Sequence, residues 1–221
     1  MSHAELIELY LAEQTKIMQQ FPVDDLSRAA DLLMETYESG GTVYGMANGG
    51  NSGTLDHFLC DFKHHPFVSE DKSVPLPDTV RRLNFVNMCG SAAELTGLVN
   101  DLGAEDMFVG SLKPFVTAAD MVVGFSGSGN SANVVRALQV ARAAGARTFA
   151  MTKGSGGRCR DIADVCVVVP GTSTFPGQTG GNDNNFHFED LSLSVNHILV
   201  GLLKQRVSQR NGAVIPSAAR R

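Results

Sequence analysis

Residues 124–138 read GFSGSGNSANVVRAL. An apolar segment ends in this stretch, which contains three serines and three glycines. An amphipathic helical pattern follows directly. Glycines let backbone amides come close to a ligand, and the first turn of a helix favours negative charge. The stretch therefore predicts a strand, a turn that faces an anion, and a helix.

The same succession of apolar segment and helical pattern extends over most of the chain. Short apolar segments rich in β-branched residues alternate with helical stretches, as they do in parallel sheets covered on both faces. We predict an α/β fold: a three-layer sandwich with a five-stranded parallel sheet, wound right-handedly and flanked by helices. The expected strands are TVYGMA, RRLNFVNM, DMVVGFS, ARTFAMT and DVCVVVP, at residues 42–47, 81–88, 120–126, 146–152 and 164–170.

Helical patterns occupy both ends of the chain. Apolar residues three and four apart predict helices over residues 4–21 and 24–41, and the second of these stops at Gly40 and Gly41. A long C-terminal helix is expected over about residues 185–209, strongly apolar on one side.

We expect one domain over residues 1–221. The N-terminal helical pair, residues 1–40, is assigned to oligomerisation, and residues 210–221 are assigned to a flexible tail. The Gly- and Asn-rich residues 171–185 are expected to form a loop over the carboxyl edge of the sheet rather than a linker.

Composition excludes several classes of protein. The 221 residues carry a net charge of −5 with 7% aromatic residues and no Trp, which disfavours a nucleic-acid surface. The apolar runs fall far short of the ~20 residues of a membrane span, and no cleavable leader is recognisable. Four cysteines without a CxxC pair indicate reduced thiols. We expect a cytoplasmic protein with no nucleic-acid or membrane partner.

A second Gly-rich junction, MANGGNSGTLDHF at residues 46–58, follows the first expected strand. One such turn is structurally ordinary, but two in a small domain favour a shared anionic ligand beyond the carboxyl ends of the strands. The motifs of nucleotide-binding loops, GxxxxGK[ST] and an opening GxGxxG, are absent from the sequence. The candidate binding residues are Asn48, Gly49, Gly50, Ser52, Ser126, Gly127, Ser128 and Ser131.

Histidines and carboxylates form a second set of candidates. In HFLCDFKHHPF, residues 57–67, His57 and Asp61 are four apart and share one helical face. Glu189 and His197 are eight apart in the last helix. A single residue of this kind is usually a surface group, but two His and two carboxylates together suit a divalent metal ion. Zinc fits best, and manganese and cobalt are the other candidates.

The stretch FSGSGNSANVVRALQVARAAG, with NGGNSGTLDHF, resembles the signature of the SIS (sugar isomerase) domain in its phosphoheptose isomerase branch. The similarity extends from about Glu5 to Gln209, and it includes GLVND at residues 97–101, which adds Asp101 to the substrate-binding candidates. It implies a flavodoxin-like SIS fold and an enzyme of carbohydrate metabolism acting on a substrate like sedoheptulose 7-phosphate. It also implies a homo-oligomer, dimer or tetramer, with shared active sites.

The resemblance also implies roles for particular residues. The family's metal is held by a His and a Glu four apart and by a Gln and a His eight apart, and these positions fall on His57, Asp61, Glu189 and His197. Asp61 then inherits the role of base and His197 that of acid in an enediol mechanism. Two identities differ from the family, since Asp replaces Glu and Glu replaces Gln.

A further departure concerns the sugar end of the site. Where the family usually has an Arg eight residues after the metal-binding His, this chain has His65, which we include among the substrate-binding residues. The leading interpretation is a metal-dependent aldose–ketose isomerase of a sugar phosphate. The alternatives are the same reaction on a sulfonated hexose of the sulfoquinovose type, and a non-catalytic regulatory SIS module that binds sugar phosphates. The retained spacings disfavour the last.

Overall fold

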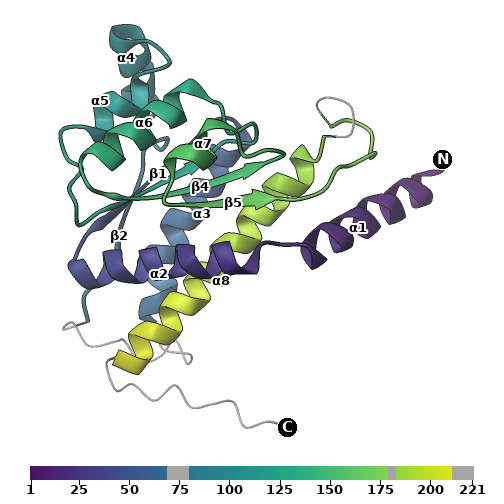
Figure 1. Cartoon of the computed structure of the whole chain (residues 1–221), viewed down its shortest axis with the longest axis horizontal. Coiled ribbons are helices and arrows are strands. Elements are labelled where there is room, and N and C mark those ends of the chain that lie inside the picture. Colours follow the sequence, from purple (N-terminus) through teal and green to yellow (C-terminus); the bar gives the residue numbers. More distant parts are fainter. Residues whose placement is uncertain (69–79, 179–182, 211–221) are drawn as a thin grey trace.

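A parallel sheet of five strands forms the centre of the protein, which we describe from a computed structural model covering residues 1–68, 80–178 and 183–210 (Figure 1). The strand order is β2-β1-β3-β4-β5, and every neighbouring pair is parallel. This is the flavodoxin-like order. It confirms the predicted fold class. The strands are β1 (Thr42–Ala47), β2 (Asn84–Asn87), β3 (Met121–Phe125), β4 (Arg147–Lys153) and β5 (Val165–Val169).

All five predicted strands are present, but β2 is shorter than its apolar pattern. It begins at Asn84, whereas the sequence suggested a start near Arg81. Among the described strands, β2 is at the edge of the sheet and pairs with β1 alone. Arg82, which was predicted to lie in this strand, precedes it, and its side chain donates to the carbonyl of Phe67 at 3.0 Å.

Helices cover both faces of the sheet. Alternate strand residues supply two separate cores, one under α2, α3 and α8 and the other under α5 and α6; Figure 1 shows these groups on opposite sides. The helices are α1 (His3–Gln19), α2 (Val23–Ser39), α3 (Gly50–His64), α4 (Ala92–Leu102), α5 (Met107–Leu112), α6 (Ala132–Ala143), α7 (Gly157–Ile162) and α8 (Asn185–Arg210), with a 3₁₀ turn η1 (His65–Phe67).

The terminal helices match the predictions closely. α2 ends as expected at Gly40, which adopts the left-handed conformation with φ 78°. α1 projects away from the sheet (Figure 1) and buries only Ile17 of its own residues. The assignment of residues 1–40 to oligomerisation stays a prediction. The predicted tail from residue 211 onward, and residues 179–182 of the predicted loop, lie outside the described residues.

The sheet order places the two Gly-rich loops next to each other. β1 and β3 are paired from Val43 with Met121 to Ala47 with Phe125, so their carboxyl ends lie side by side. α3 begins just after β1, and α6 begins seven residues after β3 ends. Within the described residues, no helix combines the length and the apolar character needed to cross a membrane.

Candidate active site

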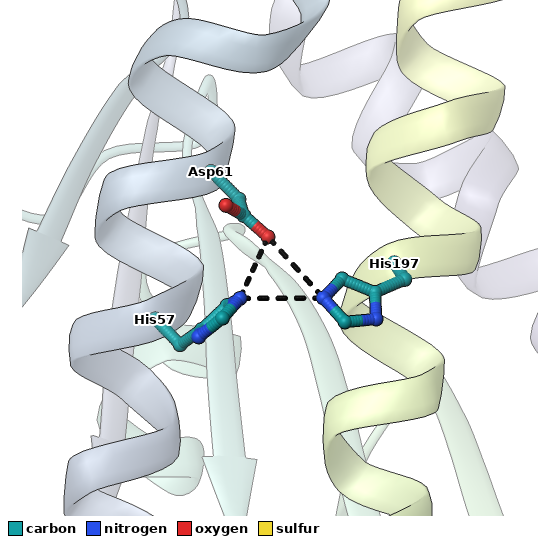
Figure 2. Close-up of side chains that lie close together, drawn as sticks. All are labelled: His57, Asp61 and His197. Atoms are coloured by element: carbon teal, nitrogen blue, oxygen red, sulfur yellow. Dashed lines mark hydrogen bonds and ion pairs between the residues drawn. The ribbon is translucent and has the colours of Figure 1, made fainter.

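Three side chains that the sequence singled out converge between α3 and α8 (Figure 2). His57 Nε2 lies 3.1 Å from Asp61 Oδ2 and 3.2 Å from His197 Nε2. His197 Nε2 lies 3.7 Å from the same Asp61 oxygen. The spacing of four places His57 and Asp61 on one face of α3, and α8 brings His197 opposite them. We call these three residues the histidine–carboxylate cluster.

The cluster is deep on its carboxylate side and open on its imidazole side. The Asp61 side chain is 9% exposed, whereas those of His57 and His197 are 47% and 57% exposed. The two rings meet edge to face, with centroids 5.2 Å apart. Neutral imidazoles and a carboxylate are the donors that zinc and similar ions take, and three protein ligands leave a coordination position for water or substrate. The donor set therefore fits a divalent cation.

Two further side chains hold the Asp61 carboxylate. Asn196 donates from Nδ2 to Oδ2 at 2.7 Å, and His65 Nε2 lies 3.5 Å from Oδ1. Asn196 was not among the site residues predicted from the sequence. The sequence did contain a sign of it: Asn196 is a polar residue within the apolar stripe of the last helix, and a buried polar group there needs a hydrogen-bond partner. His65, a predicted substrate-binding residue, therefore lies beside the cluster.

Glu189 lies apart from this cluster. Eight residues of α-helix span about 12 Å, so one straight helix separates Glu189 from His197. The Glu189 carboxylate accepts from Asn185 Nδ2 at 3.1 Å. Glu189 lies against the start of α3: a Cβ atom added to Gly50 would be only 3.1 Å from Glu189 Oε2. The structure thus brings three of the four predicted ligands together, and the role of Glu189 as a ligand stays a prediction.

The first loop is fixed to the first turn of α6 by a pair of amides. Asn48 donates to Asn133 Oδ1 at 3.1 Å, and Asn133 donates back to Asn48 Oδ1 at 2.8 Å. Gly49 caps α3 with φ 60° and ψ −136°, and the Ser52 hydroxyl donates to its carbonyl at 2.7 Å. The sequence candidates did not include Asn51, which is buried and whose Oδ1 has no hydrogen-bond partner among the described residues.

The second loop, which we call the serine loop (residues 126–131), satisfies its own hydroxyls. Ser126 is buried and donates to Ser131 Oγ at 2.9 Å, while Ser128 Oγ accepts from the Asn130 amide at 3.2 Å. Gly129 has φ 67°, and a side chain there would begin 1.9 Å from the Gly156 carbonyl oxygen. The loop is therefore held mainly by its backbone.

A lysine that was not among the predicted site residues, Lys153, lies against this loop. A side chain at Gly127 would begin 3.1 Å from Lys153 Cε, and the Lys153 ammonium pairs with Asp183. The signal for it was a cation at the carboxyl end of a buried strand. Asp101, by contrast, is exposed near the end of α4 and accepts from Asn100 at 2.9 Å, and its role in substrate binding stays a prediction.

Comparison with known proteins identifies similar sequences and folds. The SIS domain family matches residues 92–175, which include the serine loop. The phosphoheptose isomerase of Chlorobaculum parvum is 30% identical over 196 residues, covering 89% of this chain and 85% of that relative. The corresponding enzyme of Chlorobaculum tepidum is 29% identical over 197 residues, covering 89% and 86%.

Solved structures give the same picture of the fold. A phosphoheptose isomerase structure from Francisella tularensis has a TM-score of 0.75 at 20% identity, covering 93% of this chain and 100% of its own. One from Neisseria gonorrhoeae has a TM-score of 0.74 at 21% identity, covering 92% and 100%. At these identities the two structures establish a shared fold.

Proposed function

The chain belongs to the phosphoheptose isomerase family of SIS-domain proteins, and from that premise we propose that it isomerises a sugar phosphate of the sedoheptulose 7-phosphate type. Membership confirms the predicted family and the predicted enzyme class, an aldose–ketose isomerase. The observation that carries the proposal is the convergence of His57, Asp61 and His197 on one small space.

These three residues would hold the metal ion. A divalent cation bound there supplies a Lewis acid that polarises the substrate carbonyl and the adjacent hydroxyl, which makes the carbon-bound proton more acidic. Zinc is the ion that we propose, since two imidazoles and a carboxylate are donors that it commonly takes.

Asp61 is the proposed base and His197 the proposed acid. The C–H bond breaks, its proton forms an O–H bond on Asp61, and the electron pair becomes the double bond of an enediol. His197, exposed beside the cluster, moves a proton between the two substrate oxygens. Asp61 then returns its proton to the neighbouring carbon, so the enzyme ends as it began.

The serine loop is the proposed site of the phosphate. Hydroxyls of Ser126, Ser128 and Ser131 can rotate their protons outward to a tetrahedral anion while their oxygens stay in place. Lys153 lies beside the same loop, and its ammonium would have to turn from Asp183 toward the phosphate to bind it. Contacts to this distant group position the reacting carbons over the cluster, which turns binding energy into rate.

The assembly that we propose is a homo-oligomer, a dimer or a tetramer. On the projecting helix α1, Ile7, Leu11 and Met18 are each more than half exposed, and their spacing of four and seven residues places them along one face, as in an apolar patch for another protein chain. The cytoplasm is the proposed compartment. In support, Cys60, Cys89, Cys159 and Cys166 are all free thiols, as a reducing environment requires.

A second candidate is the same reaction on a sulfonated hexose. Sulfonate and phosphate are both tetrahedral anions, and serine hydroxyls do not distinguish them. His65, in the position where the family usually has an Arg, lies beside Asp61 and alters the sugar end of the site.

One assay tests both candidates. Purified protein, supplied with zinc, is incubated with sedoheptulose 7-phosphate or with sulfoquinovose, and the carbonyl products are followed by NMR. We expect turnover of the phosphate, and none in the double variant His57→Ala/His197→Ala. Turnover of sulfoquinovose alone would favour the second candidate. Binding without turnover of either would contradict the enzymatic proposal and favour a regulatory sugar-phosphate binder.

A further inference from the structure

A fully buried amide lies directly behind the histidine–carboxylate cluster. Asn196 immediately precedes His197 on α8, and its side chain is completely shielded from solvent. Its Nδ2 donates to Asp61 Oδ2 at 2.7 Å, across 135 residues of sequence. An ionised carboxylate only accepts hydrogen bonds, so the amide must turn its NH₂ group toward Asp61.

That orientation leaves the other end of the amide unsatisfied. The Asn196 Oδ1 atom is buried and has no hydrogen-bond partner among the described residues. Burying an acceptor in this way is destabilising. Val195, Leu199 and Val200, close to Asn196 along α8, are buried apolar residues. Leucine in place of Asn196 would avoid the cost, so packing alone does not account for an amide at this position.

A neighbouring residue on the same helix shows the contrast. Ser192 lies one turn before Asn196 and is equally buried. Its hydroxyl donates at 2.8 Å to the Phe188 carbonyl of its own helix, so it is satisfied locally. Asn196 instead directs its donor to the neighbouring helix α3, and specifically to the carboxylate of the cluster.

The two oxygens of Asp61 consequently have different surroundings. Oδ2 receives Asn196 and lies 3.1 Å from His57 Nε2 and 3.7 Å from His197 Nε2. Oδ1 lies 3.5 Å from His65 Nε2. The hydrogen bond from Asn196 therefore fixes the rotation of the carboxylate, with Oδ2 among the imidazoles and Oδ1 outside them.

We propose that Asn196 is a positioning residue that orients Asp61, so that Oδ2 serves the bound cation and Oδ1 is the oxygen that takes the carbon-bound proton. This inference rests on the proposed function. The proton leaves carbon, the electron pair enters the enediol, and the new O–H bond forms at Oδ1. Hydrogen bonds to ligating carboxylates from such outer residues commonly change metal affinity by about 10- to 100-fold.

The test is a cobalt(II) titration followed by visible absorbance, with thermal unfolding measured in parallel. Wild type is compared with Asn196→Leu, and Ser192→Ala is the matched control for loss of a buried polar group on α8. We expect Asn196→Leu to bind cobalt about 10- to 100-fold more weakly while its melting temperature stays equal or rises. Ser192→Ala should bind cobalt as wild type does. In an Asp61→Asn background, adding Asn196→Leu should weaken cobalt binding no further.

The other possible results of the titration contradict either the role of Asn196 or the proposed function as a whole. Equal cobalt affinity in wild type and Asn196→Leu overturns the role of Asn196 and leaves the proposed function intact. A wild-type protein that binds no cobalt overturns both. Affinity that falls only together with the melting temperature, in Ser192→Ala as well, makes Asn196 a structural residue and overturns the inference. If Asn196→Leu does not fold, Asn196→Ala is judged by the same criteria.

Discussion

The two ends of the candidate site are built in opposite ways. In the serine loop each hydroxyl already has a partner, as with Ser126 and Ser131 at 2.9 Å. In the histidine–carboxylate cluster, two imidazole nitrogens lie 3.2 Å apart beside one carboxylate oxygen, and the supporting Asn196 keeps an unpaired carbonyl. One end is held by hydrogen bonds among its own hydroxyls, and the other brings together two imidazoles and a carboxylate, a donor set that suits a cation.

This difference follows from the chemistry of the groups. A hydroxyl both donates and accepts, so a loop of serines keeps its shape without a ligand and re-aims its protons when an anion arrives. A carboxylate and neutral imidazoles held close together gain most from a cation. The proposed phosphate end is therefore preformed by its backbone, and the proposed reacting end would be completed by the cation that it binds.

The largest expected effect lies at the reacting end. Asp61→Asn removes the proposed base and a ligand, and general-base catalysis contributes about 10²–10⁴-fold, so kcat should fall by about 10³-fold. Steady-state kinetics with sedoheptulose 7-phosphate measures it. The matched control is Asp56→Asn, on the same helix, where the carboxylate accepts from Asn87 at 2.7 Å; it should retain kcat. Full turnover in a folded, zinc-loaded Asp61→Asn protein would remove Asp61 from its role.

The backbone of the serine loop gives the next effect, on stability. A methyl group at Gly129 would begin 1.9 Å from the Gly156 carbonyl oxygen, with φ at 67°. Gly129→Ala should lower the free energy of unfolding by about 2–4 kcal/mol, as strain at such positions does. Gly53→Ala is the control, because it lies in α3 with open space around it and should be neutral or slightly stabilising. Equal stability of the two variants would show that the loop backbone is not preformed.

A single hydroxyl should have a smaller effect, on binding rather than on turnover. Ser126→Ala removes one donor from the anion site and about 1 kcal/mol of hydrogen bonding, so KM should rise about fivefold with little change in kcat. Ser111→Ala, whose hydroxyl donates to Glu94 away from the loop, is the control. A fall in kcat at constant KM would place Ser126 at the reacting end instead.

The smallest expected effect concerns the Glu13 carboxylate, which, unlike Asp61, lies outside the proposed site and is hydrogen-bonded by three neighbouring residues. Burial alone raises the pKa of Glu13, but hydrogen bonds from Ser173, Thr174 and His187 outweigh it and lower the pKa from 4.5 to about 2. The stabilisation is therefore complete above pH 4.5 and is lost as the pH falls toward 2. Glu13→Gln should lower the free energy of unfolding by about 1 kcal/mol at neutral pH, and by less at pH 3.

Urea denaturation at both pH values measures this difference. The exposed Glu8, on the same helix α1, provides the control variant Glu8→Gln, which should behave as wild type at both. A deficit for Glu13→Gln that is the same at pH 3 as at neutral pH would show that the Glu13 carboxylate is not held in its charged form.

Local patterns predicted most of the fold because local physics decides it. Runs of β-branched residues placed every strand. Four strands began within one residue of the prediction, whereas the edge strand β2, which has one neighbour to hold its end, began three residues later. The spacing of His57 and Asp61 predicted a shared helical face, because α-helical geometry fixes that relation within one element.

The contacts that the sequence did not predict are those between distant elements. Nothing in a helical pattern says that Asn196 faces Asp61 rather than a local carbonyl. The pairing of Lys153 with Asp183 depends likewise on how α8 approaches the sheet. The separation of Glu189 from His197 is different, because one predicted helix already contained both residues and its rise of about 1.5 Å per residue holds them about 12 Å apart.

The central claim is that the histidine–carboxylate cluster holds a divalent cation. The most direct measurement is the metal content, by inductively coupled plasma mass spectrometry, of protein purified without chelator and of protein reloaded with zinc. We predict about one ion per chain in wild type and none in His57→Ala/His197→Ala. A wild type that takes up no ion on reloading, or a double variant that keeps its ion, would contradict the account.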